Sequence, residues 1–242
     1  MSLAKNQFDD LVDDLKATHG ANLASVMLYG SAAAGDFVAD ASDYNLLIAL
    51  KQIRPKDLRA AQAPMREWNR MGHPLPVYFT VSELQKATDV FPIEFHQMRK
   101  ARKILYGEDL LANIEISNEF LRHQTEYELR GKLIQLRRAF IPASVSTEKL
   151  LNLMSESLVS FATLFRAVLL LHGVEPPLAK RDVARMLARH LKIDGAPFEK
   201  IFDLREKNAF AQMDEVSANR LFSEYMEQIE NVIEAVDRLE KS

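Results

Sequence analysis

The chain has 242 residues, 48% of them hydrophobic and 27% charged, which is the composition of a globular protein with one large or two small domains. Its formal net charge of -3 excludes a global basic field that would attract nucleic acid or anionic lipid. Because the sequence has no cysteine, disulfides and thiolate zinc sites are excluded and a reducing compartment is favoured. No secretory signal pattern is present and no apolar run reaches the ~20 residues of a membrane span, so we expect a cytoplasmic location and no membrane partner.

The first part of the chain is expected to form a small sheet covered by helices. Apolar residues at a helical spacing predict an amphipathic helix that ends near Gly20 and covers the sheet: Phe8, Leu11, Val12 and Leu15. Three short apolar segments with Gly, Pro or Ser at their borders are predicted as strands: 23–29, 44–50 and 75–81.

The segment between the last two predicted strands is expected to be a helical crossover. Pro55 suits a first helical turn, Pro64 should interrupt the helix, and Gly72 should end it. Trp68, the only Trp in the chain, is predicted to be a packing residue on this crossover.

Beyond Ser82, which we expect to be a helix N-cap, the pattern is almost entirely helical. The predicted helices are 91–105, 117–140, 146–172, 181–191, 197–207 and 214–240. A Gly and several acidic residues interrupt the pattern at 106–117, which places an α/β domain at residues 1–110 and a helical bundle domain at 111–242. The predicted fold class is therefore α+β, with a small mixed sheet followed by an all-α bundle.

The stretch with the clearest chemical content is LYGSAAAGDFVADASDYNLLIAL, residues 28–50. A predicted strand runs into Gly30-Ser31 and a turn of small residues that includes Gly35, and glycine lets a backbone approach a ligand closely. If a short helix starts here, its free amides and the Ser31 hydroxyl would point at an anion. The sequence thus predicts a turn that can hold phosphate.

The strand after this turn carries two oxygen donors. Because side chains alternate along a strand, Asp43 and Asn45 should face the same way, roughly 7 Å apart, while Tyr44 faces the other way. Magnesium prefers a few carboxylates together with the phosphates of its substrate. An acidic strand end beside a phosphate turn is therefore a coherent beginning of a magnesium site.

This order of residues resembles the nucleotidyltransferase superfamily, which includes DNA polymerase beta, the kanamycin nucleotidyltransferases and the minimal nucleotidyltransferases. The resemblance covers residues 23–81 and extends in kind to a helical C-terminal domain. It implies transfer of a nucleoside monophosphate from a Mg²⁺-bound nucleoside triphosphate, with ATP as first candidate, to a hydroxyl of a small-molecule or protein acceptor held by the bundle. It also implies nucleotide-binding residues, Gly30, Ser31, Gly35 and Ser42, and residues that bind metal and act in catalysis, Asp43 and Asn45.

Three departures from the family pattern fall on the chemistry. Asn45 replaces the second carboxylate of the family, so it offers a carbonyl oxygen but no charge. The third carboxylate should come from 75–81, where every residue is neutral, and Ala34 stands where many members carry an Arg. Acids that could substitute as the base are Glu83, Glu126 and Glu128. The rival interpretation is a pseudoenzyme, a catalytically inactive nucleotide-binding or protein-interaction module of the same fold.

Two further patterns have a functional and a structural interpretation. The pairs Arg166–His172 and Arg185–His190 fit the Arg-x4–6-His spacing that resembles the ribonuclease motif of HEPN domains, although packing and solvation explain them more simply. The basic run 95–103 could neutralise a triphosphate, but we favour the solvated side of a helix. We find no strong nucleic-acid signal, and homo-oligomer formation is left open.

Overall fold

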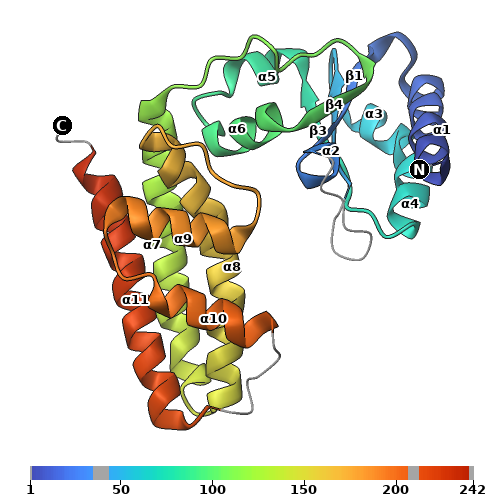
Figure 1. Cartoon of the computed structure of the whole chain (residues 1–242). Coiled ribbons are helices and arrows are strands. Elements are labelled where there is room, and N and C mark those ends of the chain that lie inside the picture. Colours follow the sequence, from blue (N-terminus) through green and yellow to red (C-terminus); the bar gives the residue numbers. More distant parts are fainter. Residues whose placement is uncertain (1, 35–43, 207–212, 240–242) are drawn as a thin grey trace. The chain divides into compact units, whose positions relative to one another are not determined.

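A computed structural model of the chain describes residues 2–34, 44–206 and 213–239. It forms two compact units, Met1–Ser117 and Asn118–Ser242 (Figure 1). The first unit contains a sheet with helices and the second contains helices, so the α+β fold class predicted from the sequence is confirmed. The sequence placed the domain boundary after residue 110, whereas the two units divide where a long helix begins at Asn118.

The first unit is organised around a four-stranded mixed sheet with the order β3-β2-β1-β4. β1 pairs antiparallel with both β2 and β4, and β2 pairs parallel with the edge strand β3. The strands are β1 (Leu23–Tyr29), β2 (Asn45–Leu50), β3 (Val77–Thr80) and β4 (Arg102–Gly107). A parallel pair needs a crossover connection, and the helices between β2 and β3 provide it.

Helices cover both faces of this sheet (Figure 1). One face of β2 packs against α1 and α4 through a core that includes Leu11, Val12, Leu15, Leu46, Ile48, Leu50, Met65 and Trp68. The other face packs against α5 and α6 through Met27, Leu47, Ala49, Leu84, Phe95 and Met98. The helices are α1 (Ser2–His19), α2 (Ser31–Ala34), α3 (Pro55–Ala60), α4 (Gln62–Arg70), α5 (Val81–Lys86) and α6 (Pro92–Lys100), with a 3-10 turn at Gly20–Asn22.

The sequence predicted the first three strands and the broken crossover helix, but it was wrong after β3. The helix predicted at 91–105 ends at Lys100, and β4 begins at Arg102, because this segment pairs with β1. The N-cap predicted at Ser82 is instead Thr80, whose side chain accepts a hydrogen bond from the Glu83 amide. The predicted helix overlooked the pairing of its last residues with β1. The predicted N-cap overlooked Thr80, which lies two residues earlier.

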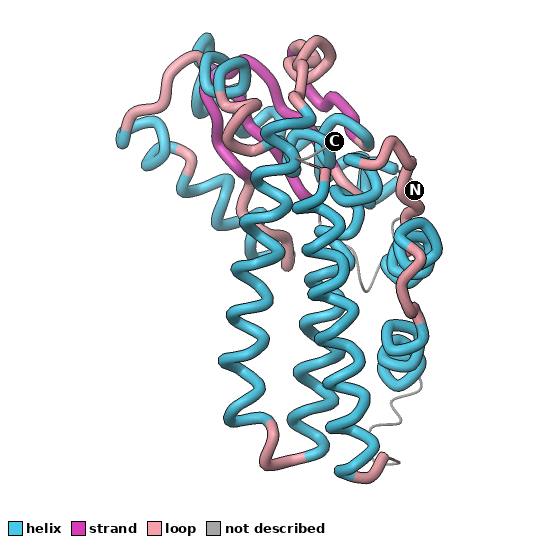
Figure 2. Tube along the Cα trace, turned by 90° about the vertical axis from the view of Figure 1, so that its left-hand side faces the viewer, coloured by secondary structure: helices cyan, strands magenta, loops and turns pink. Residues whose placement is uncertain are grey.

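The second unit is a bundle in which three long helices, α7, α8 and α11, run side by side (Figure 2). Their bounds and those of the two shorter helices are α7 (Asn118–Ala143), α8 (Thr147–Leu171), α9 (Lys180–Leu191), α10 (Ala196–Glu206) and α11 (Glu215–Arg238). These helices confirm the helical segments predicted for this half. Side-chain caps fix two of the starts, where Ser146 and Asp214 accept backbone N–H groups.

α8 is the central helix of the bundle. By length and composition it could cross a membrane, since its most apolar window has a mean hydropathy of 1.5. However, 56% of that window is buried inside the structure, and buried residues such as Phe161 and Phe165 pack against the other helices. Buried core helices meet the same criterion, and α8 has the position of one.

Candidate functional site

The turn predicted to hold phosphate lies at the end of β1. Gly30 has a φ of 81°, which residues with a Cβ rarely adopt, and α2 starts directly after it. The Gly30 N–H donates to the Ala101 carbonyl at 2.9 Å, so Gly30 contributes backbone conformation rather than a donor for a ligand. The Ala33 N–H bonds the Gly30 carbonyl at 3.0 Å and opens the helix. The N–H groups of Ser31 and Ala32 come before that of Ala33, in the first turn of the helix. N–H groups at this position have no intrahelical partner.

Asn45 is the first residue of β2 and lies beside this turn. It is half-buried and pairs with Tyr29 across the two strands. A Cβ placed on Gly30 would lie 3.5 Å from the Asn45 Nδ2 atom, so the structure brings these two predicted site residues together. The other predicted site residues fall outside the described part of the chain, namely Gly35, Ser42 and Asp43 entirely and Ser31 in its side chain.

Tyr44 and Asn45 lie on opposite faces of the sheet, as the sequence predicted. The Tyr44 ring packs 4.7 Å from the His73 ring and 6.3 Å from the Trp68 ring, between ring centroids, on the face covered by α1 and α4. Trp68 is fully buried and its indole N–H donates to the Pro74 carbonyl at 3.0 Å. The prediction that Trp68 is a packing residue is therefore confirmed.

A row of polar residues crosses three strands on the same face as Asn45. Tyr29 pairs with Asn45 on one side and with Arg102 on the other, and residues in register point to the same face. Arg102 forms an ion pair with Asp109 at 2.8 Å. Burial and the nearby charge of Glu94 raise the pKa of the Tyr29 hydroxyl. Tyr29 and Glu94 could not be found from the sequence, because Tyr29 lies beside Asn45 only through sheet pairing and Glu94 acts on Tyr29 only through the packing of α6.

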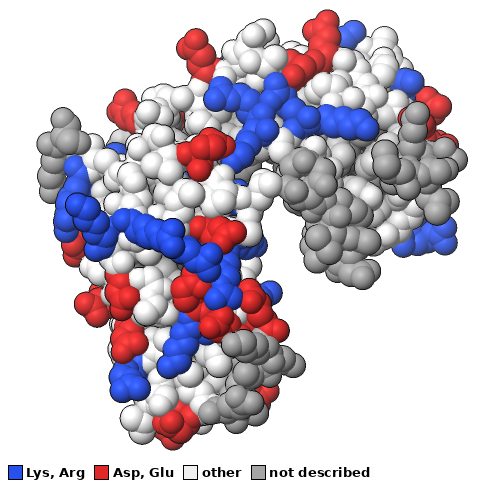
Figure 3. All heavy atoms as spheres, viewed as in Figure 1, with Lys and Arg blue, Asp and Glu red and all other residues white. Residues whose placement is uncertain are grey.

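The basic run 95–103 is divided between α6 and β4. Figure 3 shows Lys and Arg side chains gathered over these elements. Phe95 and Met98 are buried, so the helical part has the packed inner side that was predicted. The Arg99 guanidinium donates to the Ile114 carbonyl at 2.9 Å, so part of this positive charge holds the segment that follows β4.

Two of the acids considered as substitute bases are held by hydrogen bonds. The Thr80 N–H donates to the Glu83 carboxylate at 2.7 Å and the Glu83 N–H donates to the Thr80 hydroxyl at 3.1 Å, which is a capping box. Glu126 accepts from Arg130 at 2.8 Å and from Arg122 at 2.9 Å. These hydrogen bonds, that of Arg130 first, hold the pKa of Glu126 below its ordinary value, which makes it a weak base.

The described residues do not complete a site for a divalent metal. Within 2–34, 44–206 and 213–239, no group of three His, Asp or Glu residues could hold a metal ion. At the turn, Asn45 offers a neutral oxygen, and the carboxylates that the sequence places between Gly30 and Asn45, those of Asp36, Asp40 and Asp43, lie outside the described residues. Magnesium sites rely on carboxylate charge, which Asn45 does not supply.

The two Arg–His pairs that resemble a ribonuclease motif have structural partners. The Arg166 guanidinium donates to the Leu178 carbonyl. Arg185 binds the Glu199 carboxylate at 2.8 Å, within a band of basic and acidic side chains over α9 and α10 (Figure 3). These contacts tie helices and loops together, so the ribonuclease alternative gains no support from them.

His172 predicts a pH dependence of stability. Its ring lies 4.9 Å from the His190 ring, and burial followed by the charge of His190 lowers its pKa from 6.5. Because the folded-state pKa is depressed, the unfolded chain binds more protons below that value, and stability falls as the pH drops. We expect the urea midpoint, followed by circular dichroism, to fall between about pH 7.5 and pH 5. His172→Gln should weaken this dependence, and an unchanged dependence would contradict the assignment.

Comparisons with known proteins place this architecture among known folds. No family model matches the sequence, and no curated protein matches it. Among solved structures, the chain is similar to spectinomycin adenyltransferase AAD(9) from Enterococcus faecialis, crystallised with ATP and spectinomycin. The two share 12% sequence identity, the match covers 91% of this chain and 98% of that one, and the TM-score is 0.56. At this identity the likeness concerns the fold, and it confirms the resemblance found in the sequence: the chain has the nucleotidyltransferase fold.

Proposed function

We propose that the protein binds a nucleoside triphosphate, with ATP as first candidate, at the end of β1. The observation that carries this proposal is the turn at Gly30. Gly30 has a φ of 81°, and the Asn45 side chain lies next to it. The amides of Ser31 and Ala32 follow at once and can donate to phosphate oxygens. The solved structure with a similar fold was crystallised with ATP, which supports the choice of nucleotide.

The remaining roles follow from the resemblance to nucleotidyltransferases. Ser31 and Ser42 would donate hydroxyl groups to the phosphates, and Gly35 would keep the turn open for them. Asp43 would be the acidic ligand of the Mg²⁺ ion that accompanies a triphosphate, with Asn45 as a neutral helper. The helical unit would bind the acceptor, a small molecule or a protein.

Binding without efficient transfer is the form of this function that we favour. Transfer of a nucleoside monophosphate to a hydroxyl needs a general base and charge neutralisation at the phosphoryl group. Glu83 is held in a capping box, β3 has no acid, and Asn45 is neutral. A nucleotide-binding module that senses nucleotide or contacts another subunit, in the cytoplasm, fits these residues better than an active transferase does.

The test is calorimetric titration of ATP and of GTP into the purified protein, with and without Mg²⁺. We expect saturable ATP binding that Ser31→Ala and Asp43→Ala each weaken by about tenfold or more, since each variant removes a contact to the phosphates or to their cation. Ser82→Ala and Asp89→Asn are matched controls, because both residues are exposed and belong to other parts of the same unit.

Two results would contradict the proposal. Absence of binding in every condition would exclude a nucleotide site, and equal losses in the test and control variants would place binding elsewhere. A separate assay of pyrophosphate release from ATP distinguishes the two forms of the function. Rapid release in the presence of an acceptor would establish transfer and overturn our preference for a binding module.

A further inference from the structure

The first unit contains a groove of about 880 Å³ beside its edge strand β3. Residues of the crossover helices α3 and α4 line it, together with Leu75, Pro76 and Tyr78 at the start of the strand. Leu58 and Leu75 are large apolar residues of this lining, yet 47% and 62% of them are exposed. Exposed apolar residues that are flanked by polar ones are typical of a surface that binds another molecule.

Arg59 and Arg66 give this groove a positive charge. Both line it, and the described lining residues include no acid. In the described part of the chain, neither guanidinium forms a hydrogen bond or an ion pair. Burial raises the pKa of the Tyr78 hydroxyl to about 12, so Tyr78 adds no negative charge at neutral pH. The described lining therefore has a net positive charge.

The acids of α3 and α4 have partners of their own. The Asp57 carboxylate accepts a hydrogen bond from the Arg54 N–H at 2.8 Å. The Glu67 carboxylate accepts two hydrogen bonds from Arg70, at 2.7 and 3.1 Å. The hydrogen bond from Arg70 is the largest cause of the lowered pKa of Glu67, and the charge of Arg66 is the smallest. These two carboxylates therefore leave the arginines of the groove available for another anion.

The positive charge extends over the whole crossover. Residues 54–70 include five basic and two acidic residues, whereas the chain as a whole has a net charge of -3. Asp10 and Asp14 of α1 line a different pocket, together with Glu67 and Trp68. They therefore lie against other residues of α4 than those that line the groove. A basic groove on an acidic protein favours an acidic partner.

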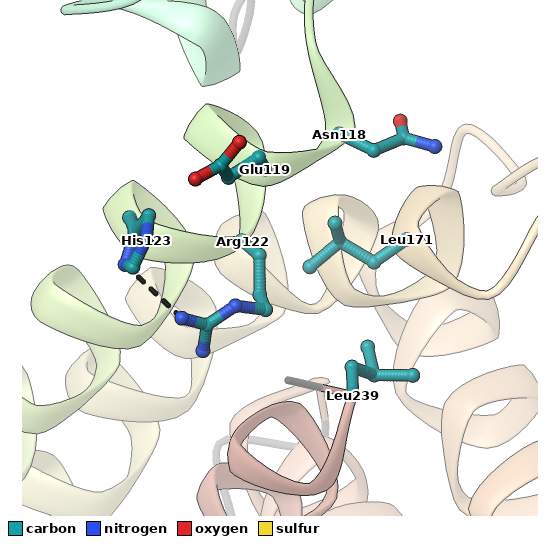
Figure 4. Close-up of a pocket in the computed structure, with 6 residues that line it drawn as sticks. All are labelled: Asn118, Glu119, Arg122, His123, Leu171 and Leu239. Carbon is teal, nitrogen blue, oxygen red and sulfur yellow. Dashed lines mark hydrogen bonds between the residues drawn. The ribbon is translucent and has the colours of Figure 1, made fainter. Parts of the chain in front are cut away.

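The pocket where α7 begins shows the contrast (Figure 4). Arg122 and Glu119 both line that pocket, and Arg122 donates to the Glu126 carboxylate at 2.9 Å. Glu126 also accepts from Arg130 at 2.8 Å, and Arg130 lies 3.8 Å from the Asp237 carboxylate. These charges balance one another, so that pocket does not select an anion. The groove beside β3 differs because no acid is among its described lining residues.

The shape and composition of the groove favour a helical peptide segment as its occupant. A membrane surface is bound by burying an apolar face in it, whereas Leu58 and Leu75 line a hollow. Single-stranded nucleic acid stacks on aromatic rings, and Tyr78, the one aromatic residue of the described lining, is half-buried. Addition of a strand to β3 is hindered, because β3 has four residues and Pro76 before it has no N–H. An amphipathic helix that lays its apolar face in a groove meets none of these obstacles.

We propose that this groove binds an amphipathic helical segment of a partner protein, with apolar residues against Leu58 and Leu75 and with carboxylates paired to Arg59 and Arg66. The inference does not rest on nucleotide binding at the Gly30 turn, since none of these residues belongs to that turn.

The experiment titrates the full chain into fluorescein-labelled synthetic peptides and follows their fluorescence anisotropy. The first peptide has leucines at helical spacing with glutamates beside them, and in the second peptide lysines replace the glutamates. We expect saturable binding of the glutamate peptide and binding of the lysine peptide that is weaker by about tenfold or more, because Arg59 and Arg66 attract one and repel the other. Raising NaCl from about 0.05 M to about 0.5 M should weaken binding of the glutamate peptide, since salt screens exposed charges.

Two double variants test the role of the arginines. Arg59→Gln with Arg66→Gln should weaken binding of the glutamate peptide about tenfold and reduce its salt dependence. Lys51→Gln with Lys56→Gln is the matched control, because it removes the same charge from exposed residues of the same unit that are not among the described lining residues. All four side chains are exposed, so we expect both variants to fold.

One further variant tests the apolar part of the groove. Leu75→Ser should weaken binding of the glutamate peptide about fivefold, because it removes an apolar contact with the helix. Val145→Ser is its control, since Val145 is 80% exposed and belongs to the second unit. It should leave the affinity unchanged.

Several results would overturn the proposal. These are absence of saturable binding by the glutamate peptide, equal affinity for the two peptides, and equal losses in the test and control variants. Binding to phosphatidylserine vesicles in place of the peptide would assign the groove to a membrane surface. A dimer in sedimentation experiments that Arg59→Gln with Arg66→Gln dissociates would assign it to a second copy of the chain, and would also overturn the proposal.

Discussion

Gly107→Ala is expected to lower the free energy of unfolding of the first unit by about 3 kcal/mol or more. Gly107 ends β4 with a φ of 77°, a conformation that costs other residues energy. A Cβ there would lie 2.0 Å from the Ala24 carbonyl oxygen and 3.0 Å from the Ser25 Cα. Both atoms belong to the backbone of the central strand β1, so they cannot yield as a flexible side chain would.

The surroundings of Gly107 leave little room for relaxation. The Ser25 hydroxyl lies 3.1 Å from the Tyr106 carbonyl oxygen and 2.8 Å from the Glu108 carbonyl oxygen, on either side of the glycine. Ser25 itself is fully buried. Moving β4 away from β1 to admit a methyl group would break these hydrogen bonds and the pairing of the edge strand, so the strain has no inexpensive release.

The measurement is urea unfolding followed by the fluorescence of Trp68, which is the only Trp and lies in the core of the same unit. Gly72→Ala is the matched control. Gly72 also has a positive φ, 89°, but an added Cβ there meets no atom within 4 Å, so backbone strain alone should cost about 1 kcal/mol. Equal losses in the two variants would show that the contact with β1 does not determine the effect.

Much of this fold could be predicted because local patterns and tertiary structure agree. β1 and β2 are continuous apolar segments between glycine and polar borders, and both are buried at the centre of the sheet. β4 could not be predicted. Phe95 and Met98 are three residues apart, as on one side of a helix, and the apolar pattern predicts that the helix continues through Ile104. Ile104 instead belongs to an edge strand and pairs with Met27 of β1.

Residue order predicted that two residues of the candidate site lie close together. Gly30 and Asn45 were identified from residue order, and the structure brings them side by side. The role of Glu83 also had a signal in the sequence, since Thr80 precedes it by three residues as in a capping box. The row from Asn45 through Tyr29 to Arg102 had no signal in the sequence, because the register of three strands alone brings these residues together.

Asn45→Asp is expected to tighten the binding of a divalent cation by about tenfold or more, measured by calorimetry with Mn²⁺ in the presence of ATP. The substitution gives the sequence the second carboxylate of the Asp-x-Asp pattern, two residues after Asp43. The Asn45 side chain lies beside the Gly30 turn, so the new charge is added where the phosphates are proposed to bind. Asn45 supplies no charge to a cation, whereas an Asp at this position would.

Asn152→Asp is the control for this prediction, because it adds the same charge at an exposed position of α8. A gain in the Asn45 variant alone would mean that the surroundings of Asn45 still admit a cation and that a carboxylate at this position is enough to bind it more tightly. No gain in either variant would mean that the surroundings of Asn45 no longer admit a cation. Nucleotide binding by the turn would then have to proceed without metal, through Ser31 and the backbone amides, and a search for a protein partner would take precedence over a search for an acceptor.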